Sequence, residues 1–230
     1  MERAQARITG FVTGCLIVSL ASVYAAAQSS PPPKGAPPRP IASTEGTVVQ
    51  YLMNHHGEVD GLLLSDGTQV HLPPHMGKDL AALAKPGDSV SVQGYRSSTG
   101  PVVVDPVITN TKTGQSITER EPSPLDRPIL PPQIRDLSLT ERHAEGTVRN
   151  LLYGPRGDVN GVVLEDHTIV RVPPPAAHEV AKLLQVGRPI TAVGYGTENE
   201  YGHVMEATAI GTSEMPMTTI TRPGARGKSR

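Results

Sequence analysis

The sequence repeats itself at a distance of one hundred positions. Glu45-Gly46-Thr47-Val48 recurs as Glu145-Gly146-Thr147-Val148, and the alignment continues without a gap to Gly94-Tyr95 and Gly194-Tyr195. Roughly 19 of about 51 aligned residues are identical, far more than unrelated segments share, which identifies an internal duplication. A period of this length indicates two copies of a small domain, because the units of a solenoid are only about 20–45 residues long.

Segments of different composition flank the two copies and set the expected domain boundaries. In these segments proline and polar residues are frequent, which is typical of extended spacers without a packed core. The chain is expected to be organised as a leader at 1–27, a proline-rich spacer at 28–43, a first domain at 44–110, a linker at 111–142, a second domain at 143–211 and a basic tail at 212–230. Spacer, linker and tail are expected to be disordered.

Residues 1–27 have the features of a secretory signal peptide. Arg3 and Arg7 precede an apolar run at 8–23, and Ala25-Ala26-Ala27 supplies the small side chains that signal peptidase requires. The apolar run is short for a membrane-spanning helix. We therefore expect cleavage after Ala27, a periplasmic or secreted protein and no transmembrane anchor after cleavage. The single cysteine, Cys15, lies in this leader, so the exported chain is expected to depend on core packing instead of disulfides.

Each copy has the pattern of a small β-domain with one helix. Asp66-Gly67 predicts a tight hairpin in which both residues have positive φ. In the strand that follows, alternation places Val70 and Leu72 in the core and Gln69 and His71 on a solvated outer face. The expected elements of the first copy are strands at 46–53, 59–64, 68–72, 89–93 and 102–109 and a helix at 78–85.

The duplication also separates residues that the fold requires from those that it does not. Asp66 and Asp166 are shared, which indicates a turn carboxylate that accepts hydrogen bonds from the backbone. Residues that differ between the copies are freer to take part in a site. The expected core comprises Val48, Val59, Leu62, Leu64, Val70, Leu72, Leu80, Leu83, Val90 and Val92, with Val148, Val159, Val162, Leu164, Val170, Val172, Val180, Leu183, Ile190 and Ala192 in the second copy.

Three strands, a helix and two further strands form the element order of an OB-fold barrel. The recurring pattern of the first copy consists of Gly46, Val48, Gly57, Gly61, Asp66-Gly67-Thr68, Val70, Pro73-Pro74, Gly87-Asp88, Val90 and Gly94-Tyr95. This pattern resembles the OB-like domains of uncharacterised exported bacterial proteins. The resemblance implies an all-β chain with one short helix per domain, built as two tandem five-stranded barrels. It carries no assigned catalytic residue.

Composition argues against several functions that OB folds commonly have. The chain has 21 basic and 22 acidic residues, no tryptophan and only 3% aromatic residues, whereas single-stranded nucleic acids are bound by basic grooves with stacking aromatics. Binding of an oligosaccharide or a nucleic acid therefore stays a minor alternative, and no nucleic-acid partner is expected. The sequence has no G-x-S-x-G, H-E-x-x-H or Walker-type motif. We expect no enzymatic activity and no cofactor.

The hypothesis that remains is a non-enzymatic binding or adaptor protein of the bacterial cell envelope. OB barrels usually bind through the loops that follow their first and fourth strands, here 54–57 and 97–100 in the first copy and 154–157 and 197–202 in the second. The expected partner is a protein or peptide, which these loops or a barrel edge could bind. The candidate binding residues are Asn54, His55, His56, Arg96, Ser98, Arg156, Arg171, Asn199 and Tyr201.

Four histidines of the first copy suggest an alternative function. His55, His56, His71 and His75 have the counterparts Pro155, Arg156, Arg171 and Pro175, so the fold does not require imidazole at any of them. Neutral imidazole is a ligand of copper, zinc and nickel. A periplasmic metal-binding protein that uses these four histidines is therefore the alternative. The opposing interpretation is that His71, like Arg171, lies on a solvated strand face.

Overall fold

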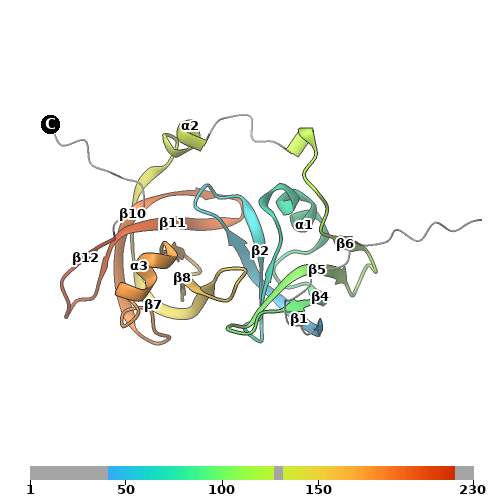
Figure 1. The fold of residues 1–230 in the computed structure, drawn as a ribbon, viewed down its shortest axis with the longest axis horizontal. Coiled ribbons are helices and arrows are strands. Elements are labelled where there is room, and N and C mark those ends of the chain that lie inside the picture. Colours follow the sequence, from blue (N-terminus) through green and yellow to red (C-terminus); the bar gives the residue numbers. More distant parts are fainter. Residues whose placement is uncertain (1–40, 127–131, 221–230) are drawn as a thin grey trace, which may run out of the picture. The chain divides into compact units, whose positions relative to one another are not determined.

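The two sequence copies fold as two closed five-stranded barrels (Figure 1). The computed structural model describes residues 41–126 and 132–220. The predicted leader, the spacer up to residue 40 and the tail from residue 221 lie outside the described residues. Among those described, no helix is both long enough and apolar enough to cross a membrane.

The first barrel closes in the order expected of an OB fold. Strand β1 is long because its first half pairs with β4 and its second half pairs with β2. The barrel closes where β3 pairs in parallel with β5, Gln69 opposite Val102. The elements are β1 (Ile41–Met53), β2 (Val59–Leu64), β3 (Gln69–His71), the 3₁₀ turn η1 (Pro74–Met76), α1 (Gly77–Leu83), β4 (Ser89–Arg96) and β5 (Val102–Asn110).

The second barrel repeats this topology strand for strand. Its closure is the parallel pairing of β9 with β11, Ile169 opposite Val204. Each barrel has one helix between its third and fourth strands; α1 contacts β2, and α3 contacts β8 (Figure 1). The elements are β7 (Thr140–Tyr153), β8 (Val159–Leu164), β9 (Ile169–Arg171), α3 (Pro174–Glu179), β10 (Pro189–Asn199) and β11 (Gly202–Gly211). The predicted fold class is thereby confirmed.

The core and most turns agree with the sequence analysis. Every predicted core residue is buried except Val159, which is partly buried. The turn carboxylates Asp66 and Asp166 each accept hydrogen bonds from the backbone N–H and hydroxyl of the threonine two residues on, at 2.9 Å. The prediction of positive φ at both hairpin residues is wrong, because among positions 66 and 67 only Gly67 has it, at 86°.

The segment between the barrels contains short elements in its described parts. These are β6 (Ser116–Thr118), which pairs with β5, the 3₁₀ turn η2 (Pro124–Asp126) and α2 (Pro132–Asp136). Arg120 forms ion pairs with Asp126 and Asp79 at 2.7 and 3.3 Å and so ties this segment to α1. The beginning of the predicted tail adds β12 (Thr218–Thr219) to β11. The strands β6 and β12 extend existing sheet edges, and η2 carries the Asp126 that pairs with Arg120; composition alone reveals none of these contacts.

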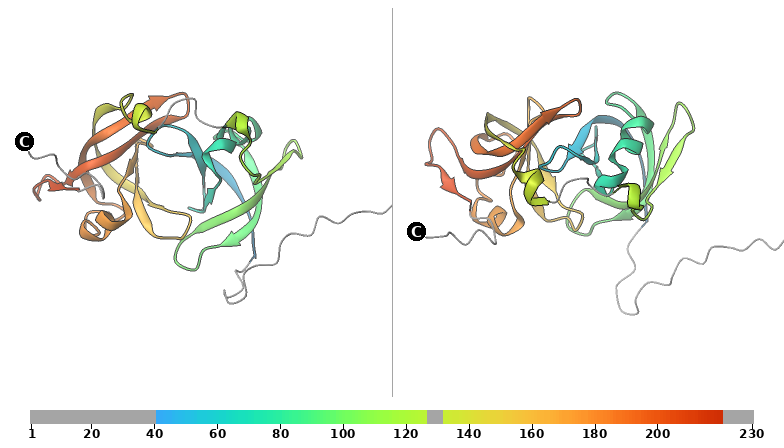
Figure 2. Two further views of the ribbon diagram at one scale, coloured as in Figure 1. Left: turned by 45° about the horizontal axis from the view of Figure 1, so that its top comes forward. Right: turned by 90° about the horizontal axis from the view of Figure 1, so that it is seen from above.

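The two barrels lie side by side (Figure 2), and part of the outer face of the first is buried against residues of the second. The described residues of both barrels belong to one compact unit. Leu152, Val163, Ile169 and Val204 of the second barrel belong to the same buried apolar cluster as the core of the first. The prediction of a solvated face at Gln69 and His71 is therefore wrong, since these side chains are only 1% and 7% exposed.

Candidate functional site: the cleft between the barrels

The loops predicted to bind a partner contact each other across the junction of the two barrels. Asn199 Nδ2 donates a hydrogen bond to the carbonyl of Gly57 at 2.8 Å. In the equivalent contact, the hydroxyls of Ser97 and Thr99 donate to the carbonyl of Arg156 at 3.0 and 2.9 Å. The first loop of each barrel thus contacts the last loop of the other barrel, and the loops of one contact correspond to those of the other by the one-hundred-residue shift.

Glycine is required at the centre of both loop contacts. Gly57 and Gly157 have φ values of 79° and 86°, which disfavour any side chain. A Cβ atom on Gly57 would lie 2.5 Å from Thr197 Cγ2, and one on Gly157 would lie 2.2 Å from Thr99 Oγ1. The glycine shared by the two copies at this position therefore serves the interface between the barrels as well as the turn.

Most of the other candidate binding residues also belong to this interface or to its local turns. Tyr201 packs edge-on against Tyr51, with ring centroids 5.5 Å apart. The side chain of Asn54 accepts hydrogen bonds from the backbone N–H groups of His56 and Glu58 at 3.0 and 3.1 Å. Arg96 and Ser98 are exposed. The predicted loops are therefore largely occupied by each other.

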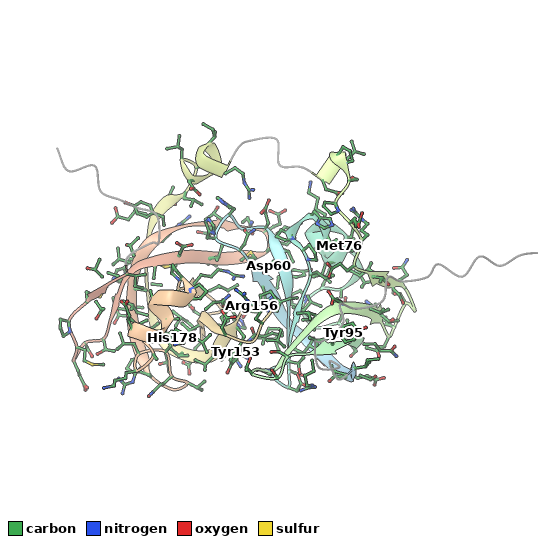
Figure 3. All side chains as sticks on the ribbon, in the orientation of Figure 1. Asp60, Met76, Tyr95, Tyr153, Arg156 and His178 are labelled. Atoms are coloured by element: carbon green, nitrogen blue, oxygen red, sulfur yellow. The ribbon has the colours of Figure 1, made fainter. Side chains whose placement is uncertain are left out.

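A cleft with a volume of about 290 Å³ lies between the barrels beside these loops. Its apolar wall is formed mainly by prolines, together with Leu72 and Val104. Figure 3 labels Asp60, which lines the cleft, and Tyr153 and Arg156 near it, where the two barrels meet. The lining consists of Asp60, His71, Leu72, Pro73, Pro74, Val104, Asp105, Glu119, Pro155, Asn160 and Arg171.

One half of the cleft is closed by an ion pair between the barrels. Arg171 Nη2 lies 2.7 and 3.1 Å from the two carboxylate oxygens of Asp60. Arg171 Nε donates a further hydrogen bond to the carbonyl of Met53. The side chains of Arg171 and Asp60 are 14% and 15% exposed, so both charges are largely withdrawn from water and depend on each other.

The other half of the cleft has the equivalent residues without the charges. His71 and Asn160 occupy the positions that correspond to Arg171 and Asp60. The His71 ring hydrogen-bonds to the backbone of Tyr153, the counterpart of Met53. However, His71 Nε2 and Asn160 Oδ1 are buried and find no hydrogen-bond partner within the described residues. An unpartnered buried polar atom is costly, and these two line one cleft.

Two carboxyl groups lie at the rim of the cleft. Asp105 adopts a φ of 50°, which is uncommon for a residue with a side chain. Burial and the nearby charge of Asp105 raise the pKa of Glu119 above its usual value, and the two side chains are hydrogen-bonded. With Asp60 and Arg171 included, the acidic groups of the cleft outnumber the basic ones. The cleft therefore favours a positively charged ligand.

Acidification is expected to destabilise the protein through His71. Burial lowers the pKa of His71 below its usual value of 6.5, with Asp60 opposing and Arg171 adding to this effect. The unfolded chain therefore binds a proton at His71 more readily than the folded chain does. The contribution of neutral His71 to the free energy of unfolding is fully present above pH 6.5 and is lost as the pH falls below 6.5. For one histidine the loss is at most about 1.4 kcal/mol per pH unit. Urea unfolding between pH 7.5 and 5 should show this loss, and His71→Asn should reduce it. An unchanged slope in His71→Asn would contradict the prediction.

The four histidines proposed as a metal site are not brought together. His71 lines the cleft, and the Nε2 atom of His75 hydrogen-bonds to the carbonyl of Arg120 at 2.9 Å. His55 and His56 lie side by side with ring centroids 4.0 Å apart. Within the described residues, the one group of three or more potential ligands joins these two with Asp136. His71 and His75 lie on either side of Pro73-Pro74 in the sequence, but their side chains have different surroundings. His71 faces the cleft, whereas His75 faces the segment after β6.

The sequence matches no protein-family model, and no curated protein is significantly similar to it. The function is therefore inferred from the geometry of the cleft.

Four residues of the cleft were not predicted from the sequence, namely Asp60, Asn160, Asp105 and Glu119. A signal was present for the first two. Asp60 has the neutral counterpart Asn160, and Arg171 has the counterpart His71. The two charged residues pair with each other in one half of the cleft, and the two counterparts lie in the other half. A search for positions that change together between the two copies would have linked Asp60 and Arg171 with Asn160 and His71. No comparable signal exists for Glu119, which lies outside the repeat.

Proposed function

We propose that this chain is a non-enzymatic binding protein of the bacterial cell envelope whose site is the cleft between the barrels. The ligand class is a basic side chain, lysine or arginine, of a peptide or protein partner. The observation that carries the proposal is the pair of buried, unpartnered atoms on two residues that line the cleft, His71 Nε2 and Asn160 Oδ1. A ligand that bridges them would supply the missing hydrogen bonds.

The shape and charge of the cleft support a basic side chain. Its volume of about 290 Å³ is at the lower end of the range for small-molecule sites, which suits one extended side chain better than a large ligand. The apolar wall of Leu72, Val104 and the prolines can pack against the methylene stem, while Asp105 and Glu119 attract the charged end. Asn160 Oδ1 is an acceptor for an N–H donor.

Two further features support a binding role in the envelope. The described lining contains no hydroxyl, thiol or amine, and its carboxylate Asp60 is engaged in the ion pair with Arg171. The leader-like residues 1–27 support export. Loops that hold the two barrels together leave the cleft as a preformed site, which limits the entropy lost on binding.

Peptide titration followed by NMR tests this function. The capped tripeptide Ala-Lys-Ala should shift the imidazole signals of His71 and the side-chain amide of Asn160, whereas Ala-Glu-Ala should not. The double substitution Asp105→Asn with Glu119→Gln should weaken binding of the lysine peptide several-fold, because it removes the negative charge of this carboxyl pair.

A cleft-filling variant provides the specific control. The double substitution His71→Arg with Asn160→Asp copies the Arg171–Asp60 ion pair into the neutral half, so the polar atoms satisfy each other and binding should be lost. His178→Gln, on the exposed face of α3 (Figure 3), should bind normally. Equal binding of both peptides, or unchanged binding by the double variant, would refute the proposal.

A further inference from the structure

A second cluster of ligating side chains lies outside the cleft. It joins His55 and His56, from the loop after β1, to Asp136, from the last turn of α2. Asp136 Oδ1 lies 3.7 Å from His55 Nε2 and 3.5 Å from His56 Nε2. None of the three lines the cleft. The cluster therefore needs an explanation of its own.

The ligand atoms of the cluster all lie within 4.8 Å of one another, and the two distances from Asp136 are close to those between atoms around one small ion. Ligand atoms that lie 2.0–2.1 Å from a tetrahedral zinc ion are about 3.3 Å apart. The two distances from Asp136 exceed this value by only a few tenths of an ångström. Two imidazole nitrogens and one carboxylate oxygen also form a donor set of the kind that borderline divalent metals prefer.

A second carboxylate is placed to orient one of the ligands. Glu206, on β11 of the second barrel, has its Oε2 atom 3.7 Å from His55 Nδ1. Its side chain is only partly exposed. When His55 ligates through Nε2, its other ring nitrogen carries the proton and faces Glu206. A carboxylate behind a ligating histidine is the usual arrangement in metal sites, because it fixes the tautomer and the ring orientation.

Other contacts position the two segments that carry the three ligands. Arg135, next to Asp136, forms an ion pair with Glu58 at 2.7 Å and thereby docks α2 on the loop. Asn54 Nδ2 donates a hydrogen bond to the same Glu58 carboxylate at 2.7 Å, and its Oδ1 accepts one from the backbone N–H of His56. The geometry of the cluster is therefore preorganised, as binding sites require.

The cluster is specific to the first barrel. The counterparts of His55 and His56 are Pro155 and Arg156, which cannot ligate a metal, and Asp136 belongs to the segment that is not repeated. Whatever the cluster does is therefore done once per chain and is not required by the OB fold.

We propose that His55, His56 and Asp136 bind one divalent transition-metal ion of the zinc class, with Glu206 orienting His55 from behind. The site is independent of the peptide-binding cleft. A bound ion fastens α2 to the loop of the first barrel, and through Glu206 it connects both to β11 of the second barrel.

Calorimetric titration of the EDTA-treated full chain with Zn²⁺ tests the site. One ion per chain should bind, and Mg²⁺, which prefers oxygen ligands, should not compete. Asp136→Asn should weaken Zn²⁺ binding at least tenfold, and His55→Gln should do the same. His178→Gln removes an exposed histidine and should leave binding unchanged. Because Asp136 is exposed, Asp136→Asn should unfold in urea at the same concentration as the parent chain.

NMR identifies the ligands independently of affinity. Of the eight histidines in the chain, only the imidazole signals of His55 and His56 should shift with one equivalent of Zn²⁺. The absence of Zn²⁺ binding would overturn the proposal. So would unchanged affinity in Asp136→Asn, equal weakening in His178→Gln, or shifts centred on His71 and His75.

Discussion

Replacing Ile169 with aspartate will destabilise both barrels, although the residue belongs only to the second. Ile169 is fully buried, and it lies in the apolar cluster that continues into the core of the first barrel. An unpaired carboxylate at this position would have neither water nor a partner. The expected loss is about 3–5 kcal/mol in the free energy of unfolding.

Hydrogen exchange measured by mass spectrometry distinguishes this shared loss from a local one. In Ile169→Asp, β2 of the first barrel should lose protection together with β8 of the second, because the barrels stabilise each other. Val186→Asp is the matched control, since Val186 is 64% exposed and its replacement should change stability by no more than about 0.5 kcal/mol. If β2 kept its full protection in Ile169→Asp, the interface would not contribute to the first barrel.

Arg171→Leu is expected to destabilise the chain by about 3 kcal/mol at neutral pH. Its guanidinium is the ion-pair partner of Asp60 across the junction, and both side chains are largely buried. Removing the cation leaves a buried carboxylate without its partner, and this is more damaging than removing both charges. The double variant Asp60→Asn with Arg171→Leu should therefore recover most of the lost stability in urea unfolding.

A surface ion pair serves as the comparison. Arg142 and Glu198 lie 3.4 Å apart, and their side chains are 38% and 50% exposed, so Arg142→Leu should cost less than about 1 kcal/mol. Similar losses for Arg142→Leu and Arg171→Leu, or no recovery in the double variant, would show that the buried pair has no special weight.

Both barrels could be predicted from the sequence because each has its own local signals. The alternation of Val70 and Leu72, the turn at Asp66-Gly67 and the proline stop at Pro73-Pro74 all act within a few residues. The hundred-residue repeat then confirmed each element a second time. Such signals are local, and the OB-like topology followed from their order.

The junction of the barrels was missed, although part of it is visible in the sequence. Leu62, Leu63 and Leu64 are consecutive and all buried, whereas a barrel strand exposed on one side should alternate. The unbroken apolar run therefore indicated burial on both faces. The same holds for Val162, Val163 and Leu164 in the second copy.

A polar residue at the junction gave no such signal. Gln69 occupies a polar position of the alternating pattern, which predicts exposure to solvent. Instead, its Nε2 donates a hydrogen bond to the carbonyl of Leu151 at 2.7 Å, and its Oε1 accepts one from the backbone N–H of Tyr153 at 2.9 Å. Similarly, His167 takes the place of Gly67 with a φ of 70° and contacts Gln50 Oε1 through Nδ1 at 2.7 Å. Contacts between segments about one hundred residues apart cannot be read from local periodicity.

The reciprocal loop contacts have a consequence for how the cleft acquired two unlike halves. In an isologous homodimer, both subunits use the same surface patch to contact each other. The two barrels contact each other in this way, although they belong to one polypeptide. Identical subunits would carry the same residues on both sides, and hence two ion pairs or two neutral pairs. Only after fusion could Arg171 and Asp60 stand opposite His71 and Asn160. Asymmetry of this kind is available to a fused dimer and to no symmetric one.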